Sequence, residues 1–90
     1  MKKAIISVVG HDNVGIIARI CTYLADNKIN ILDISQTIVS GYFNMMMVVD
    51  VANIEMEFSK LAEDLSILGD DIGVTVHCQR EDIFTSMHRI

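Results

Sequence analysis

The sequence predicts one α+β domain in which strands and helices follow in the order β-α-β-β-α-β. Four short stretches rich in β-branched residues end at turn residues, as strands do. Two longer stretches place apolar residues three and four positions apart, as one face of a helix does. That order is the ferredoxin-like sandwich, a four-stranded antiparallel sheet with two helices on one face. The 90-residue length fits one such domain.

The first strand is expected over residues 3–9 and the first helix over 14–27. "KAIISVV" is β-branched and is followed by Gly10. After it the apolar period changes to that of a helix. The predicted buried stripe of this helix is Ile17, Ile20, Cys21 and Leu24.

A β-hairpin is expected next, with strands over residues 29–41 and 42–51. "INILDISQTIVSG" ends at Ser40-Gly41, a plausible turn into "YFNMMMVVDV". In the ferredoxin-like order the first and third strands lie in the centre of the sheet. These two are also the most apolar strands, as central strands covered on both faces should be.

The second helix is expected to start after an Asn53 cap and to end before Gly69. Its apolar residues recur at intervals of four and three positions, as one face of a helix does: Ile54, Phe58, Leu61, Leu65 and Leu68. The fourth strand, residues 73–78, alternates inward Val74, Val76 and Cys78 with outward polar residues.

The sequence divides into a domain over residues 1–80 and a tail over 81–90. "REDIFTSMHRI" spaces Ile83, Phe84, Met87 and Ile90 as a short C-terminal helix does. A helix this short needs a surface to dock on, in the same chain or in a second subunit.

The composition predicts a homodimer or another homo-oligomer. Apolar residues make up 51% of the chain. If Met45 and Met47 face the helices, Met46 and Val48 lie on the opposite face of the sheet. An apolar patch of this kind on a small domain indicates a partner.

The charge balance excludes some partners. The formal net charge is −5, so direct binding to nucleic acid is not expected. No apolar run is long enough to span a membrane, and we expect a cytoplasmic protein. Cys21 and Cys78 are expected to be buried, reduced thiols.

The segment "GHDNVGIIA" joins the first strand to the first helix. It lacks the lysine and hydroxyl residue of a Walker phosphate loop and also the dinucleotide fingerprint, so we exclude nucleotide hydrolysis. The start of a helix nevertheless suits a carboxylate or another anion. Gly15 lets a ligand approach the backbone closely. The simpler alternative is a structural turn in which Asp12 or Asn13 caps the helix.

No catalytic or metal-binding set emerges from the sequence. His11, His77 and His88 have no partners at ligand spacing, so we expect no metal and no cofactor. Both cysteines lie on predicted core faces, which disfavours a nucleophile. An enzyme such as an acyl-phosphate hydrolase would want an arginine in the first turn of the helix, whereas Arg19 lies a turn inside it. The protein is therefore not expected to be an enzyme.

Gln36 is the one polar residue on the apolar row of the second strand that contains Ile34 and Ile38. Such a residue either forms hydrogen bonds at the edge of a sheet or faces a ligand.

The segment "VVGHDNVGIIARICTYLADNKINILDISQTI" resembles the ACT domain family through its motif V-x-G-x-D-x-x-G-I-[IV]-A and its polar "NKINI" turn. The resemblance covers about residues 3–79. The whole chain is similar to stand-alone bacterial ACT-domain proteins and to the ACT domains of the glycine cleavage system transcriptional repressor.

This resemblance implies regulation by a ligand, usually an amino acid, in domains that pair across their sheets or helices. The function we expect is a dimeric module that senses an amino acid or a related small metabolite and acts through a protein partner. In the family the ligand lies at a domain interface, near the first strand-helix loop and against the second strand. Asp12 and Gly15 match the family's aspartate and glycine. The candidate binding residues are His11, Asp12, Asn13, Val14, Gly15, Ile16 and Gln36. The alternative function is a protein-protein interaction or dimerisation module that binds no ligand.

Overall fold

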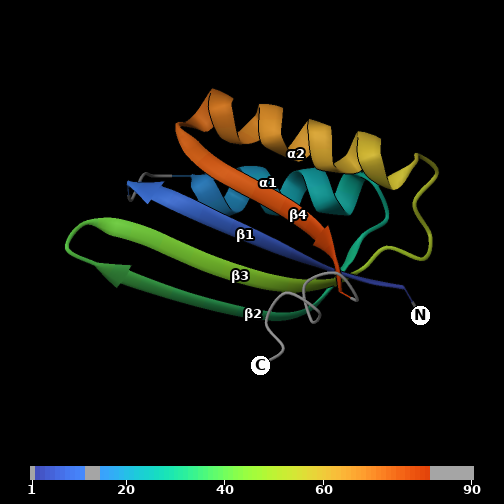
Figure 1. Ribbon diagram of the computed structural model, residues 1–90, viewed down its shortest axis with the longest axis horizontal. Helices are drawn as coiled ribbons and strands as arrows, with labels where there is room; N and C mark the ends of the chain where they lie inside the picture. Colours follow the sequence, from blue (N-terminus) through green and yellow to red (C-terminus); the bar gives the residue numbers. More distant parts are fainter. Residues whose placement is uncertain (1, 12–14, 82–90) are drawn as a thin grey trace.

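The computed structural model describes residues 2–11 and 15–81 and forms two layers, a sheet and a pair of helices on one of its faces (Figure 1). The predicted order of elements is confirmed. Their bounds are β1 Lys3–His11, α1 Ile16–Asp26, β2 Asn30–Val39, β3 Tyr42–Asp50, α2 Phe58–Ile72 and β4 Val74–Arg80.

The sheet has the strand order β2-β3-β1-β4, and every neighbouring pair is antiparallel. The most apolar strands, β1 and β3, therefore lie in the centre, as predicted. Their helix-facing side chains are fully or almost fully buried: Ala4, Ile6, Val8, Phe43, Met45, Met47 and Val49. Together with Ile16, Ile20, Leu24, Leu61 and Leu65 from the helices, these residues make one core.

The β2–β3 hairpin turns over two residues. Ser40 has φ 52° and Gly41 has φ 81°, and Val39 pairs with Tyr42 across the turn. Two consecutive positive φ angles are those of a type I′ turn, which matches the twist of the flanking strands. The predicted turn at Ser40-Gly41 is confirmed.

The prediction for the bounds of the second helix was wrong at both ends. Asn53 is not the cap, because α2 begins at Phe58 after Glu57, and residues 51–57 form a connection. Ile54 packs against the core from this connection without being helical. At the other end α2 continues past Gly69 to Ile72, with Gly73 at φ 81° as its C-cap.

Gly69 has a packing role inside α2. A Cβ atom at this position would lie 2.7 Å from Val76 Cγ2 and 2.8 Å from the carbonyl oxygen of Val74. Glycine therefore lets the helix lie directly against β4. This close approach explains why position 69 is a glycine, since the helix does not end there.

The other element boundaries shift by smaller amounts. β1 continues through Gly10 to His11, β4 continues to Arg80, and α1 begins at Ile16. Apart from Glu81, the predicted C-terminal helix of residues 81–90 lies outside the described residues. Over the part of the chain that is described, no helix has both the length and the apolar character needed to cross a membrane.

The sheet face opposite the helices is mixed. Ile5 is buried there, whereas Val9 and Met46 remain 46% and 41% exposed. The prediction that Met46 lies on this second face is confirmed by its register opposite Ser7. Apolar side chains are thus accessible on the outer face of the central strands.

Candidate functional site

The structure describes four of the seven predicted binding residues. Three of these four lie where β1 leads into α1. His11 is the last residue of β1, Gly15 is the N-cap of α1 and Ile16 is its first residue. Asp12, Asn13 and Val14 lie outside the described residues. Gln36 is on β2, at the edge of the sheet.

Gly15 has φ 88° and ψ 0°, the left-handed conformation that favours glycine. Its carbonyl oxygen accepts the first helical hydrogen bond, from the Arg19 amide at 2.9 Å. Within the described residues no side chain caps α1, and its first turn contains no acidic residue. Among the described residues other than its chain neighbours, none lies within 4 Å of a Cβ atom built on Gly15. The first amide groups of α1 therefore carry a partial positive charge.

The Ile16 side chain is buried in the core. It is only 2% exposed and belongs to the core cluster. Of the predicted residues around the turn, Ile16 can therefore offer a ligand its backbone amide but not its side chain.

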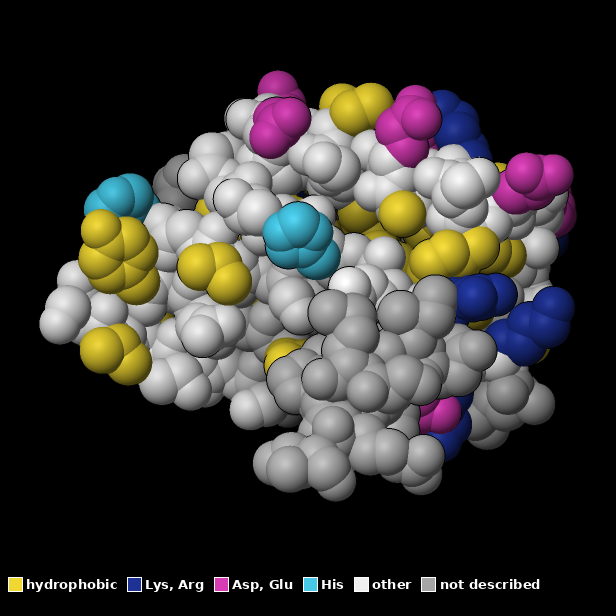
Figure 2. All heavy atoms as spheres, in the orientation of Figure 1, with side chains coloured by type: hydrophobic (Ala, Val, Ile, Leu, Met, Phe, Trp, Pro, Cys, Tyr) yellow, Lys and Arg dark blue, Asp and Glu magenta, His cyan; other side chains and the backbone are white. Residues whose placement is uncertain are grey.

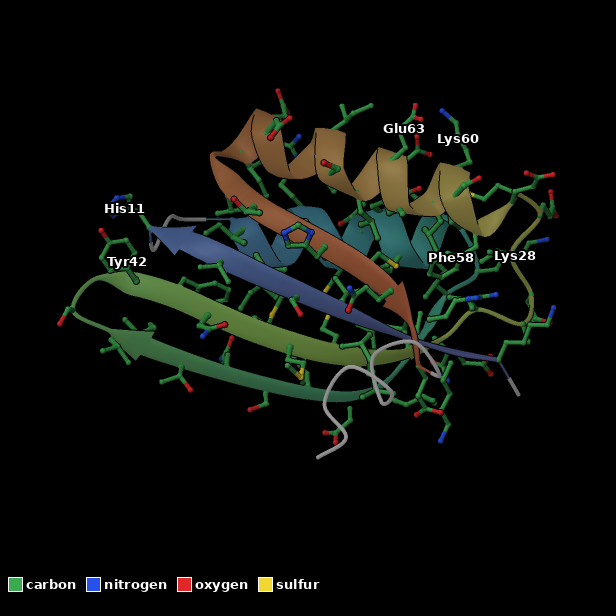
Figure 3. All side chains as sticks on the ribbon, viewed as in Figure 1. His11, Lys28, Tyr42, Phe58, Lys60 and Glu63 are labelled. Carbon is green, nitrogen blue, oxygen red and sulfur yellow. The ribbon has the colours of Figure 1, made fainter. Side chains whose placement is uncertain are left out.

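His11 stacks on Tyr42, which begins β3. The ring centroids lie 4.6 Å apart, at an interplanar angle of 29° (Figure 3). The pair is held by the sheet register, because His11 and Tyr42 are direct partners of β1 and β3. Tyr42 is 53% exposed, so the stack forms an accessible aromatic surface next to the first turn. The sequence analysis did not identify Tyr42. The available signal was its position directly after the hairpin glycine, because β3 starts there and pairs with the end of β1.

Gln36 lies on the helix-facing row of β2, opposite Met45 of β3. Its row neighbours Ile34 and Ile38 are 45% and 59% exposed, although the opposing β3 residues are buried. β2 is an edge strand, and this row remains accessible. The structure thus places Gln36 on the helix-facing side of the edge strand.

The two cysteines are free and half-buried against the core. Burial raises the pKa of the Cys78 thiol to about 12. A thiol with that pKa is protonated near neutral pH and is a poor nucleophile. The expectation that both thiols are buried is met only in part, because each cysteine is half-buried at the margin of the core.

The principal polar cluster between the helices is structural. The Tyr23 hydroxyl of α1 donates a hydrogen bond to Asp64 Oδ2 of α2 at 3.0 Å, and Lys60 Nζ lies 3.0 Å from Asp64 Oδ1. Burial, reinforced by Asp64, raises the pKa of Tyr23 above its ordinary value. The hydrogen bonds from Lys60 and Tyr23 lower the pKa of Asp64. This cluster fastens α1 to α2.

Within residues 2–11 and 15–81, no group of three His, Cys, Asp or Glu side chains could hold a metal ion. The features that the described residues show here are the left-handed Gly15 at the start of α1, the His11–Tyr42 stack and the exposed edge strand β2. They belong to a small domain of one sheet and two helices.

The chain belongs to the ACT domain family. Residues 2–79 match the family's sequence model, whose description is "ACT domain". The UPF0237 protein of Bifidobacterium longum is 64% identical over 90 residues, which is the whole of both chains. ACT domains form a family of regulatory modules that bind small ligands, and they commonly dimerise and bind amino acids.

Solved structures agree with this assignment. An ACT domain protein from Streptococcus pneumoniae superimposes with a TM-score of 0.82 at 38% identity, covering 92% of this chain and 93% of that one. The structure titled a putative glycine cleavage system transcriptional repressor gives a TM-score of 0.74 at 20% identity. That likeness covers 88% of this chain and 45% of the other and shows the shared fold.

Proposed function

We propose that this protein is a regulatory module that senses an amino acid or a related small metabolite at a subunit interface and acts through a protein partner. The observation that carries the proposal is the left-handed Gly15 at the start of α1, which has no side-chain cap among the described residues. In sequence, only residues 12–14 separate Gly15 from His11 of the exposed His11–Tyr42 stack.

The chemistry of this end of the sheet suits an amino acid. Amide groups at the start of a helix favour a carboxylate. The exposed faces of His11 and Tyr42 offer apolar and aromatic contact to a side chain. The Gln36 amide can both donate and accept hydrogen bonds. Asp12, Asn13 and Val14 complete the proposed set from the same turn.

We also propose that two copies pair along β2. The ten-residue edge strand presents unpaired backbone groups beside exposed Ile34 and Ile38. A second β2 strand would cover this apolar row and bring Gln36 into the interface. The ligand would then contact both subunits, which links binding to assembly.

Replacing Ile38 by aspartate should convert the dimer into a monomer, because a charge in an apolar interface is costly to desolvate. Sedimentation equilibrium should give a mass near twice the 10.0 kDa of one chain for the unmodified protein and near 10.0 kDa for the variant. Ile67→Asp is the matched control, since Ile67 is as exposed as Ile38 but lies on α2. A monomeric unmodified protein, or dissociation by Met46→Asp but not by Ile38→Asp, would contradict pairing along β2.

Replacing Gly15 by alanine should abolish the response to the amino acid ligand. The added methyl group would occupy the space through which the ligand approaches the backbone. Gly41→Ala is the matched control, because Gly41 also has a positive φ and open space around it. Both variants should lose a similar stability, about 1–2 kcal/mol from the left-handed backbone. The measurement is thermal unfolding of all three proteins in the presence of each of the twenty amino acids.

An amino acid that stabilises the unmodified protein and Gly41→Ala but not Gly15→Ala supports the proposal. An equal response from all three proteins would remove Gly15 from the site. Silence across the whole panel would favour the second candidate, a ligand-free interaction or dimerisation module. The exposed Val9 and Met46 on the outer sheet face support that alternative.

We propose further that the protein is not an enzyme and works in the cytoplasm. The raised pKa of Cys78 argues against a thiolate nucleophile, and the two separate free cysteines fit a reducing compartment.

A further inference from the structure

A second candidate binding site lies at the opposite end of the sheet from His11. The first residues of β1, the last residues of β4 and the connection before α2 surround a cavity of about 610 Å³. Three cationic residues and five apolar ones account for most of its wall. The cations are Lys2, Lys3 and Arg80, and the apolar residues include Val51, Ile54 and Phe58.

The sheet register builds this cavity from segments that are far apart in sequence. Lys3 pairs with Asp50 of β3, and Ala4 pairs with Arg80 of β4. The Val51 amide donates a hydrogen bond to the Lys2 carbonyl oxygen at 2.8 Å, which fixes the connection beside the start of β1. Figure 3 shows Phe58 at the start of α2, at the far end of the molecule from His11 and Tyr42.

The two lysines that line the cavity differ from Arg19, Lys28 and Lys60 in their distance from carboxylates. Arg19, Lys28 and Lys60 each lie within 4.0 Å of a carboxylate of this acidic chain. Lys2 and Lys3 form no such pair in the described part of the chain, although Glu57 and Glu81 also line the cavity. Figure 2 shows Lys and Arg side chains in dark blue beside hydrophobic side chains in yellow at this end of the molecule. Both lysine charges are therefore available to an incoming anion.

The start of α2 adds to this positive potential. Glu57 is the N-cap of this 15-residue helix, and no side chain of the described residues caps it. Glu57 and Phe58 both line the cavity, so the first turn of α2 faces it. The partial positive charge of the helix start and the two lysines act on the same space.

We propose that this cavity binds a small organic acid with an apolar tail. Its carboxylate would lie between Lys2 and Lys3, and its tail would lie along Val51, Ile54 and Phe58. The volume falls in the range of about 300–1,000 Å³ typical of small-molecule sites. Neither a purely polar anion nor a purely apolar molecule uses both parts of this wall. The site is separate from the β1–α1 turn and does not depend on the function proposed there.

The test uses hexanoate as the probe and ¹H–¹⁵N NMR spectra of the full chain as the readout. Hexanoate should shift the amide signals of Val51, Ile54 and Phe58 and leave those of Gly15 and Gln36 unchanged. Acetate lacks the tail and hexylamine lacks the negative charge, so each should bind at least about tenfold more weakly.

The double variant Lys2→Gln/Lys3→Gln should weaken hexanoate binding about tenfold to a hundredfold, because charge-assisted contacts to the carboxylate are lost. Lys60→Gln is the matched control, since Lys60 is also an exposed lysine but does not line the cavity. All of these side chains are exposed at the surface, and circular dichroism should show unchanged folding. Hexanoate binding that is equal in the double variant and the control, or the absence of shifts at the cavity residues, would overturn the proposal.

Discussion

Replacing Leu65 by alanine should lower the free energy of unfolding by about 2–5 kcal/mol. Leu65 is completely buried at the centre of the α2 stripe, where it packs into the core beneath the helices. The substitution removes apolar contacts and leaves a cavity that the close-packed surroundings fill only in part. Urea unfolding followed by circular dichroism measures the change. In a small domain a loss of this size leaves little stability.

Ile67→Ala is the control for this prediction. Ile67 lies two residues away on the same helix but is 58% exposed, so its truncation should change the free energy of unfolding by less than about 0.5 kcal/mol. Alanine has a higher helix propensity than either leucine or isoleucine, so helix propensity does not account for a loss of stability in Leu65→Ala. Equal losses from Leu65→Ala and Ile67→Ala would show that the buried face of α2 has been misassigned.

Replacing Gly69 by valine should destabilise the fold by about 1–3 kcal/mol or more. The new Cβ atom would lie 2.7 Å from Val76 Cγ2 and 2.8 Å from the Val74 carbonyl oxygen. The Val74 oxygen belongs to the backbone of β4, so α2 and β4 must move apart. Thermal and urea unfolding both measure the loss.

Ser66→Val introduces the same side chain at an exposed position of α2 and serves as the matched control. Valine has a somewhat higher helix propensity than glycine, so helix propensity alone favours Gly69→Val. A Gly69→Val protein as stable as the unmodified one would show that α2 does not depend on close contact with β4 at this position.

The sequence predicted the order of elements and the position of the sheet's central strands because period and composition encode them locally. Alternating apolar residues identified the inward row of β4, and Ser40-Gly41 identified the hairpin turn. The bounds of α2 were predicted wrongly for a tertiary reason. Gly69 looks like a stop signal in sequence, but it is buried against β4, and Ile54 continues the helical spacing from outside the helix.

The candidate site was only partly predictable from sequence. The glycine motif predicted that the β1–α1 turn would be a candidate site, and the structure adds the left-handed conformation of Gly15. Tyr42 was missed because its contact with His11 arises from the pairing of β1 with β3. The cavity at the other end was missed for the same reason, since Lys3, Val51 and Arg80 meet only through the sheet register.

The measurement that tests the proposed ligand site most directly is a set of ¹H–¹⁵N NMR spectra recorded with each of the twenty amino acids in turn. The proposed function predicts that one or a few amino acids shift the amide signals of His11, Gly15, Ile16 and Gln36. If no amino acid shifts these signals, or if all shifts are confined to residues around the cavity such as Lys3 and Val51, the β1–α1 turn is not the sensory site.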